Sequence, residues 1–335
     1  MTGSSMKSGK LTEAQCKRSV LRLLPVSGGT VVQGAGIGYD YGAVQLNKDC
    51  QMVTAMSTMT LGVPEPEKYT FWKALNKLET SGAVPVAIMV NLILPARGSE
   101  SRIKEITGNL AKLCILHKID YLGGHTELME ELRSPVITVI AYGRQEGSET
   151  GYSIHNVKPG ESILMLGYTA MEATAMLLAD KWEELNTRYA AGYLEGARKL
   201  GEDLSLHRAF TVLDKEKVTY IHDISTGGVF AALWELGEGA GCGIEAFLRT
   251  IPIQQETVEI CEFFDINPYM AMGGGSALIV TPEAEAVLET LKKNEIFAIR
   301  IGQTTEQNDR IVTNADYTRY LEPPKGDEIY KLYRN

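Results

Sequence analysis

The stretch HDISTGGVFAALWELGEGAGCGIE, from His222 to Glu245, combines the parts of an anion-binding turn. It follows a strand-like run, VTYI, and places His222 and Asp223 where that strand ends. Gly227 and Gly228 let a ligand approach the backbone, and the helix that follows begins with free N–H groups, which suit a phosphate. Asp223 could hold a divalent cation that bridges phosphate oxygens. The alternative is that these polar side chains only cap the helix.

The composition is that of a globular protein with room for two domains. The chain has 335 residues, of which 44% are hydrophobic and 22% charged. A net charge of −9 argues against nucleic acid and anionic membranes as partners. No apolar run predicts a transmembrane helix or a secretion signal. Five scattered cysteines predict neither a disulfide framework nor a zinc site, so we expect a cytoplasmic protein.

Strand and helix patterns recur in both halves of the chain, which predicts a mixed α and β protein. A turn, KPGE, precedes a new strand at residues 162–166 and a helix from Met171 to about Leu185. We therefore place a domain break at this turn. The predicted domains are residues 11–157 and 158–335, preceded by a disordered start or tag at residues 1–10.

Local patterns in the first half predict three further elements. Thr12 and Gln15 form a capping box, and the helix that they open should run until Pro25, with one apolar face made of Cys16, Val20, Leu23 and Leu24. Residues 84–95, VPVAIMVNLILP, are apolar on both faces and predict a fully buried strand. Residues 121–128, YLGGHTEL, predict a loop after a short strand.

A glycine-rich loop, GAGIGYDYGA, contains Gly34, Gly36 and Gly38. A dinucleotide-binding fingerprint requires a helix directly after such glycines, and here the strand-like run YGAVQL follows. The spacing therefore disfavours a Rossmann site. Asp40, just past this loop, could instead reach a metal ion or simply stabilise a turn.

The motif GGHTEL places His125 and Glu127 after two glycines. Because side chains alternate in extended backbone, these two residues can share one face. A satisfied loop is the alternative to a functional site here.

These segments, in this order, resemble the AIR synthase-related superfamily, which includes aminoimidazole ribonucleotide synthetase, thiamine-monophosphate kinase, selenophosphate synthetase and the hydrogenase maturation factor HypE. The HypE-like members are the most similar, over nearly the whole chain. The segments that carry the resemblance are GKLTEAQCKRSVL, GIGYDYGAV, NKLETSGAVPVAIMVNLILP, GGHTEL, HDISTGGVFAALWE and EICEFFDINPYMAMGGGSALIV.

The resemblance implies an α+β fold of two PurM-like α/β domains. The strands of the N-terminal domain would pair with a second subunit into a barrel, which makes the protein a homodimer, and the C-terminal domain would pack against it. ATP would lie in the cleft with its phosphates held through Mg²⁺. The γ-phosphate would then pass to a small-molecule substrate, so the partners are a nucleotide and that substrate.

Carried onto this sequence, the resemblance and the motifs assign three roles. Asp40, Glu127 and Asp223 would hold magnesium. His125 and His222 would act as a base or as orienting groups. The nucleotide would contact a further set of residues, namely Gly36, Gly38, Asn76, Lys77, Gly123, Gly124, Gly227 and Gly228.

Two positions depart from the family pattern. Ser57 stands where an aspartate is expected, and Lys77 replaces the aspartate that should follow Asn76. Serine is a weaker metal ligand than a carboxylate, and a lysine repels a metal ion but can contact phosphate as a point charge. The alternative is that Lys77 faces solvent, as most lysines do.

The end of the chain departs from the HypE pattern as well. No cysteine follows Cys261, so carbamoyl-to-cyanide chemistry on a terminal cysteine has no acceptor in this sequence. Two hypotheses remain. The first is an ATP-dependent phosphoryl-transfer or synthetase-type enzyme. The second is a catalytically reduced dimeric paralogue with a binding or regulatory role.

Overall fold

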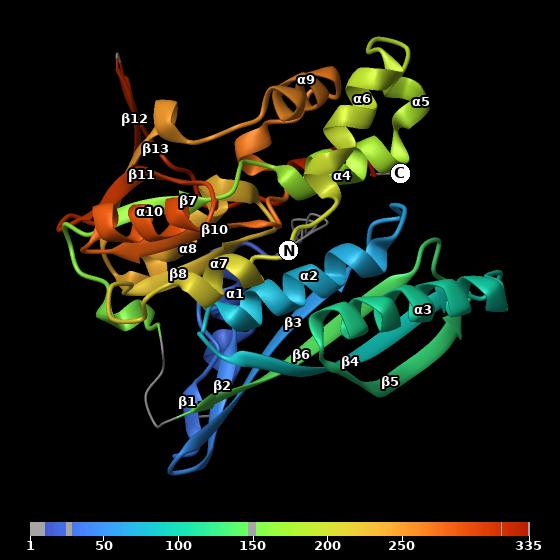
Figure 1. Ribbon diagram of the computed structural model, residues 1–335, viewed down its shortest axis with the longest axis horizontal. Helices are drawn as coiled ribbons and strands as arrows, with labels where there is room; N and C mark the ends of the chain where they lie inside the picture. Colours follow the sequence, from blue (N-terminus) through green and yellow to red (C-terminus); the bar gives the residue numbers. More distant parts are fainter. Residues whose placement is uncertain (1–10, 25–28, 147–151, 316, 334–335) are drawn as a thin grey trace, which may run out of the picture.

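The computed structural model describes residues 11–24, 29–146, 152–315 and 317–333. Within them the chain forms two sheets, each with its own helices (Figure 1). The sheet of the N-terminal half ends at Glu146 and that of the C-terminal half begins at Ser162, so the predicted domain break falls between the sheets. Residues 1–10 and Pro25, the predicted helix stop, lie outside the described residues.

The N-terminal half forms one mixed sheet with the strand order β1-β2-β3-β6-β4-β5. All neighbours are antiparallel except β4 and β5, which are parallel because a helix crosses between them. The strands are β1 (Val31–Gln33), β2 (Gly42–Asn47), β3 (Cys50–Met59), β4 (Val84–Pro95), β5 (Asp120–Met129) and β6 (Val136–Glu146). The strand predicted from the run YGAVQL, after the glycine-rich loop, is confirmed as β2.

Two helices cover one face of this sheet (Figure 1). The first, α2 (Pro66–Glu79), starts with a proline at its first position, where the missing N–H costs nothing. The second, α3 (Glu100–His117), begins at Ser99, whose hydroxyl accepts the backbone N–H of Arg102. These helices bury one face only. The prediction that β4 is buried on both faces is therefore wrong, and Val84, Val86 and Met89 are exposed.

β5 corrects another prediction, because YLGGHTEL is part of a strand and not a loop. Gly124 has a φ of +150°, and a Cβ there would lie 1.8 Å from the carbonyl oxygen of Val90. Gly124 thus allows close pairing beside an irregularity in β4 between Ile88 and Val90. Glycines that signal a loop in the sequence mark a close backbone approach in the fold.

The C-terminal half forms a second sheet with the order β13-β12-β9-β11-β7-β10-β8. Its strands are β7 (Ser162–Leu166), β8 (Tyr220–Ile224), β9 (Gly243–Phe247), β10 (Ser276–Thr281), β11 (Ala298–Thr305), β12 (Arg310–Asn314) and β13 (Tyr317–Tyr320). β7, β8 and β10 are buried along their whole length, as continuous apolar runs predict. The helices are α4 (Met171–Asp180), α5 (Trp182–Leu185), α6 (Ala191–Arg198), α7 (His207–Val212), α8 (Gly228–Ala240), α9 (Gln255–Phe263) and α10 (Ala284–Lys293).

α2 lies between the two halves and joins their apolar cores (Figure 1). Phe71 and Leu75 of α2 belong to one cluster of buried side chains with Leu177 of α4 and Ile260 of α9. The helix also presents polar residues to the C-terminal half, which positions them at the functional site described below. No helix in the described parts of the chain is long and apolar enough to cross a membrane.

Two predicted helices are shorter than the sequence suggests. The capping box of Thr12 and Gln15 is confirmed, but α1 (Glu13–Ser19) ends early, and Val20, Leu23 and Leu24 are exposed instead of forming a packed face. The helix predicted from Met171 to about Leu185 is interrupted at Lys181, which separates α4 from α5.

Candidate functional site

The clearest functional arrangement lies at the end of β8, where residues from both halves of the chain meet. Asp40 follows the glycine-rich loop of the N-terminal half, and its Oδ2 lies 2.8 Å from Nδ1 of His222. The same oxygen accepts the backbone N–H of Asp223 at 2.9 Å. On its other side, Nε2 of His222 lies 3.4 Å from Oε2 of Glu235 on α8. The imidazole is therefore held between two carboxylates.

The charge on His222 follows from these neighbours. Burial disfavours the protonated ring, but the charges and hydrogen bonds of Asp40 and Glu235 outweigh burial and raise the pKa of His222 to about 10. At neutral pH the ring is a cation: Nδ1 donates to Asp40, and Nε2 lies within ion-pair distance of Glu235. His222 therefore orients Asp40 and has no free lone pair with which to act as a base in this state.

Asp223 is the group at this site with free acceptor capacity. Its side chain is buried, and neither carboxylate oxygen has a hydrogen-bond partner among the described residues. Burial and the neighbouring charge of Asp40 raise the pKa of Asp223 to about 7, although Lys77 and His222 act in the opposite direction. A carboxyl group that titrates near neutral pH is suited to proton transfer.

A second charged pair lies beside Asp223 and was not predicted from the sequence. Nζ of Lys73, on α2, lies 2.8 Å from Oε1 of Glu172 at the start of α4, and the two side chains are only 3% and 1% exposed. Oε2 of Glu172 also accepts the backbone N–H of Gly274 at 3.2 Å. Burial opposes the charge of Lys73, but Glu172 raises its pKa, so the pair is ionic. The only signal in the sequence is that Lys73 and Lys77 are one helical turn apart.

The start of α8 holds an anion that belongs to the chain itself. The carboxylate of Asp327 accepts the backbone N–H groups of Gly227, Met272 and Ile329. Burial raises the pKa of Asp327 to about 7, and the hydrogen bonds from Gly227 and Ile329 oppose the shift. The position for which the sequence predicts a phosphate is thus occupied by a side chain from the C-terminal segment. Nothing in the sequence around Asp327 indicates this contact.

The remaining glycines of the predicted nucleotide site have structural reasons for being glycine. Gly38 has a φ of +80°, and a Cβ there would lie 2.6 Å from the carbonyl oxygen of Glu235. Gly228 has a φ of +66°, and a Cβ there would lie 2.7 Å from the carbonyl oxygens of both Tyr269 and Ala271. At Gly36 a Cβ would overlap the ring of Tyr39. These glycines bring the loop, α8 and the 269–271 turn together, and their contact with a nucleotide stays a prediction.

Asn76 and Lys77 have different positions although they are adjacent on α2. Asn76 is buried, donates to the carbonyl oxygen of Leu204 at 2.8 Å and accepts the N–H of Leu206 at 3.0 Å. Its amide therefore fastens α2 to the C-terminal half. Lys77 is half-buried, and its charge acts on Asp223. The contact of Lys77 with a phosphate stays a prediction, as does the alternative that it faces solvent.

His125 and Glu127 lie apart from this arrangement within one chain. They occupy the same face of β5, with Nε2 of His125 3.2 Å from Oε2 of Glu127, as alternation along extended backbone predicts. Their side chains are 67% and 50% exposed. β5 is the edge strand opposite β1 and β2, so β4, β6 and β3 separate it from the Asp40 side of the sheet. Gly123 and Gly124 lie on the same edge strand.

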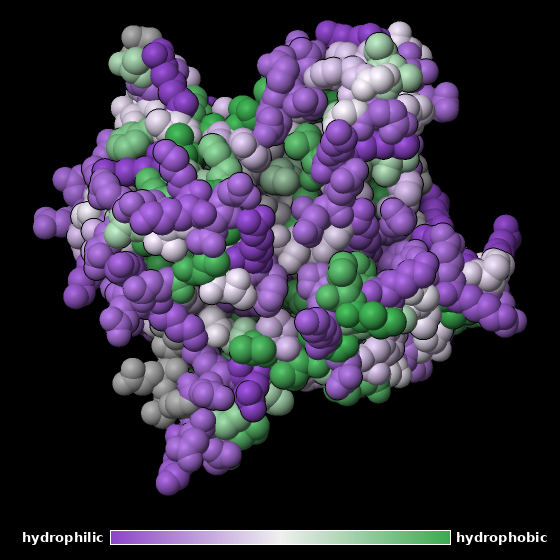
Figure 2. Space-filling model, in the orientation of Figure 1, coloured by the Kyte–Doolittle hydropathy of each residue, from purple (hydrophilic) through white to green (hydrophobic). Residues whose placement is uncertain are grey.

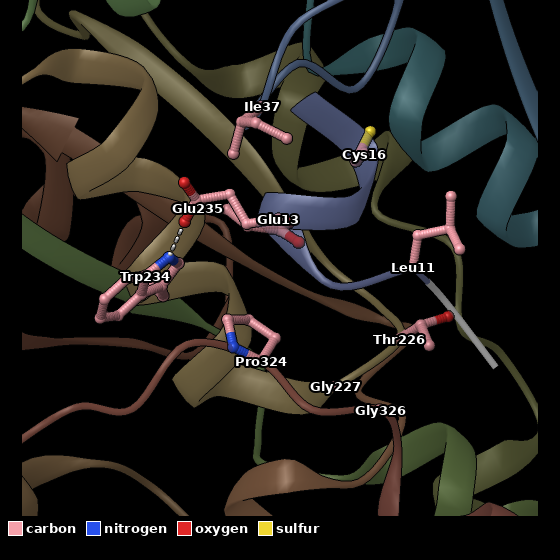
Figure 3. A pocket seen from close by; sticks show the side chains of 10 residues that line it. All are labelled: Leu11, Glu13, Cys16, Ile37, Thr226, Gly227, Trp234, Glu235, Pro324 and Gly326. Carbon is pink, nitrogen blue, oxygen red and sulfur yellow. Dashed lines mark hydrogen bonds between the residues drawn. The ribbon is translucent and has the colours of Figure 1, made fainter. Parts of the chain in front are cut away.

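An apolar pocket adjoins the His222 network (Figure 3). It lies between α1, α8 and the C-terminal segment, and Nε1 of Trp234 donates to Oε2 of Glu13 across it at 2.9 Å. Glu235 contributes to its wall and also contacts His222. The other residues that line it are Leu11, Cys16, Ile37, Thr226, Gly227, Pro324 and Gly326.

Comparison with known proteins identifies the family of this chain. The model of the AIR synthase related protein, N-terminal domain, matches residues 38–145, and that of the C-terminal domain matches residues 158–314. The chain belongs to the AIR synthase-related family. A similar member is a putative hydrogenase expression/formation protein of Methanocaldococcus jannaschii, 24% identical over 77% of this chain and 76% of the relative.

Solved structures of AIR synthase-related proteins share the fold. HypE of E. coli superposes with a TM-score of 0.70 at 16% identity, covering 90% of this chain and 94% of HypE. A hydrogenase maturation protein HypE in complex with ATP gives a TM-score of 0.64 at 16% identity, covering 95% and 96% of the two chains. The predicted family and the two-domain fold are confirmed.

Proposed function

We propose that this protein is an ATP-binding enzyme that transfers a phosphoryl group to a small molecule at the end of β8. The observation that carries the proposal is the meeting of Asp40, from one half of the chain, with His222 and Asp223 from the other. Lys77 adds a positive charge at the same place. Structures with this fold include one in complex with ATP, which supports the choice of nucleotide.

The site residues would divide the chemistry between them. Lys77 would contact a phosphate as a point charge. Asp223, whose pKa is about 7, would take a proton from the hydroxyl of the acceptor, and positively charged His222 would keep Asp40 in place. The apolar pocket beside Glu235 is the nearest space for the body of an acceptor molecule.

Nucleotide binding in this proposal requires the C-terminal segment to move. Asp327 holds the N–H groups of Gly227 and Met272, which a phosphate would use. The phosphate would therefore replace a carboxylate and inherit its backbone donors. The same backbone donors suit either group, because both accept hydrogen bonds through oxygen.

A second copy of the chain is the remaining part of the proposed enzyme. The open face of the N-terminal sheet exposes Val86 and Met89. Figure 2 shows further hydrophobic side chains on the side that carries the helices, where α3 ends and β4 begins. Pairing of the open faces of two copies would cover Val86 and Met89. It would also bring His125 and Glu127 of one copy close to the other copy. Light scattering across a range of protein concentrations tests for the dimer. A monomer at every concentration would reject the proposed dimer.

Thermal unfolding with and without ATP tests the nucleotide. A ligand at about a hundred times its dissociation constant adds roughly 2.7 kcal/mol to the free energy of unfolding. We expect such a stabilisation with ATP and a smaller one with adenosine, since the phosphates supply the contacts. Equal melting temperatures with and without ATP would reject the proposal.

Asp223→Asn tests whether Asp223 is the base of the proposed reaction. The variant keeps the shape of the side chain and removes its ability to take a proton, so phosphate release or transfer should fall at least about a hundredfold while ATP still binds. Asp309→Asn, at an exposed position, is the matched control. Unchanged turnover in Asp223→Asn would exclude Asp223 as the base.

Two observations favour a second candidate, a catalytically reduced paralogue with a binding role. Ser57, at the position where the family pattern implies an aspartate, is buried in β3. Asp327 occupies the backbone donors at the start of α8. Such a protein would bind ATP without turnover in the presence of any acceptor, so the thermal and turnover measurements together separate the two candidates.

A further inference from the structure

A large cavity, distinct from the site at β8, lies between the two halves of the chain. It has a volume of about 620 Å³, and its walls come from α2, from the end of α3 and the start of β4, and from residues 202–208. A smaller cavity of about 220 Å³ adjoins it, since the two share Glu79, Val84, Pro85 and His207. Clefts of this size between domains are a usual place for a small-molecule ligand. None of the residues assigned to the proposed reaction lines either cavity.

One wall of the larger cavity is a stripe of side chains on α2, and the stripe ends in a carboxylate. Trp72, Leu75 and Glu79 follow one another at intervals of three and four residues, so they share one face of the helix. An apolar residue at position 79 would complete the stripe and pack without electrostatic cost. Glu79 instead places a carboxylate there, with only 4% of the residue exposed. A buried charge requires compensation by its neighbours.

The neighbours of Glu79 compensate its charge only in part. Its Oε1 accepts a hydrogen bond from Nδ1 of His207, the first residue of α7, which lies beside α2 (Figure 1). Its Oε2 has no hydrogen-bond partner among the described residues. Burial raises the pKa of Glu79, and the hydrogen bond and charge of His207 do not fully offset the increase. The carboxylate can therefore accept a further donor from a ligand.

The other titratable groups that line the two cavities select the charge of a ligand only weakly. Burial lowers the pKa of His117 below its usual value, so its ring is neutral at pH 7. The charged groups are exposed, and water weakens their attraction for a ligand. Both signs occur among them, namely Glu202, Asp203, Lys118, Arg208 and Lys215. The buried carboxylate of Glu79 therefore decides which charge is favoured.

We propose that this cavity binds a small organic cation, an ammonium or guanidinium group on an apolar body, with its charge paired to Glu79. The body would lie against Trp72 and Leu75 and would cover Val84 and Leu116, which are 61% and 73% exposed. In the described ranges no three His, Cys, Asp or Glu side chains are grouped to hold a metal ion, which favours an organic cation over a metal here. This inference does not depend on the proposed function.

Tryptophan fluorescence observes the cavity directly, because Trp72 lines it and the chain has only three tryptophans. In Trp182→Phe/Trp234→Phe, Trp72 is the only tryptophan left. We expect its emission to change saturably with phenethylammonium, and to need at least about tenfold more 3-phenylpropanoate, an anion of similar size, for the same change. Isothermal titration of the unaltered protein repeats the comparison without any substitution. No saturable response to phenethylammonium, or an equal response to the anion, would overturn the proposal.

Glu79→Gln and His207→Ala separate a ligand site from a purely structural pair, because both remove the same contact between the halves. Glu79→Gln should weaken phenethylammonium binding at least about tenfold. His207→Ala, at a half-exposed side chain, should strengthen it, since the second carboxylate oxygen becomes free.

Glu285→Gln, at an exposed position of α10, is the matched control and should bind the probe as the unaltered protein does. Binding that survives Glu79→Gln, or that falls equally in Glu79→Gln and His207→Ala, would contradict the proposal. If Glu79→Gln does not fold, His207→Ala decides alone, and weaker binding in that variant rejects the pairing of the cation with Glu79.

Discussion

The residues that the sequence assigns to one site lie in two regions with opposite environments. At the end of β8, His222 and Asp223 are buried, and the charges around them are matched at hydrogen-bonding distance. On β5, His125 and Glu127 are largely exposed and contact each other. Glycines, a histidine and a carboxylate occur in both motifs. The difference teaches that the surroundings, more than the motif, decide what such residues contribute.

Desolvation explains the contrast. A buried charge costs several kcal/mol unless a partner compensates it, whereas an exposed ion pair contributes roughly 0–1 kcal/mol because water competes with it. The β8 region should therefore respond strongly to the loss of one charge, and the β5 pair should respond weakly. The predicted losses of stability are largest for the buried charges near β8 and smallest for the exposed pair on β5.

Lys73→Met should have the largest effect. It leaves the carboxylate of Glu172 buried without its cation, and we expect the free energy of unfolding to fall by about 3–5 kcal/mol in a urea titration. Replacing both residues, in Lys73→Met/Glu172→Met, should recover much of this loss. As a control, Lys104→Met breaks an exposed pair with Glu100 and should cost less than about 0.5 kcal/mol. Equal losses in the two single variants would contradict the contrast.

His222→Asn should have the next largest effect and should also change the pH dependence. Because the pKa of His222 is raised to about 10 in the folded protein, its protonation stabilises the fold fully below its usual pKa of 6.5. That stabilisation is lost as the pH rises from 6.5 to about 10. The variant should lose this dependence and about 2–3 kcal/mol at pH 7, because Asp40 loses the charged donor that His222 supplies.

Urea titrations at several pH values from 6 to 10 measure this effect. The exposed residue His125 offers the matched control, and His125→Asn should leave the pH profile unchanged. A profile for His222→Asn that parallels that of the unaltered protein would show that His222 does not carry the proton assigned to it.

The fold was largely predictable because its elements have local causes. Continuous apolar runs predicted β7 and β10, and the capping box predicted the start of α1. The failures have tertiary causes. β4 is apolar on both faces although only one is covered within the chain, and Gly124 permits close strand pairing where glycines usually signal a loop.

The candidate site was predictable only in part. The pairing of Asp40 with Asp223 follows from motifs that the family resemblance connects. Lys73, Glu172 and Asp327 could not be found in this way, since each is an ordinary surface residue by type and becomes significant through its partner from a distant segment. Charge pairing across 99 residues, as between Lys73 and Glu172, leaves no local pattern in a sequence.

Asp327→Asn should lower stability less than the two changes above, and it should strengthen ligand binding. The new amide nitrogen would face the N–H of Gly227 or those of Met272 and Ile329, so we expect a loss of about 1–2 kcal/mol in urea unfolding. The variant also removes the negative charge that competes with phosphate, so ATP should bind more tightly. Glu306→Gln, at an exposed position, is the control. Weaker ATP binding in Asp327→Asn would show that Asp327 does not occupy the phosphate position.

His125→Ala should have the smallest effect, and its dependence on concentration is informative. In a dilute monomer the change removes one exposed pair with Glu127, so the free energy of unfolding should move by less than about 0.5 kcal/mol. If a second copy covers β5, the pair becomes buried, and the same variant should lower stability more at high protein concentration than at low concentration. Urea titrations at two concentrations distinguish these cases. A small loss at both would mean that the exposed pair stays at the surface in solution.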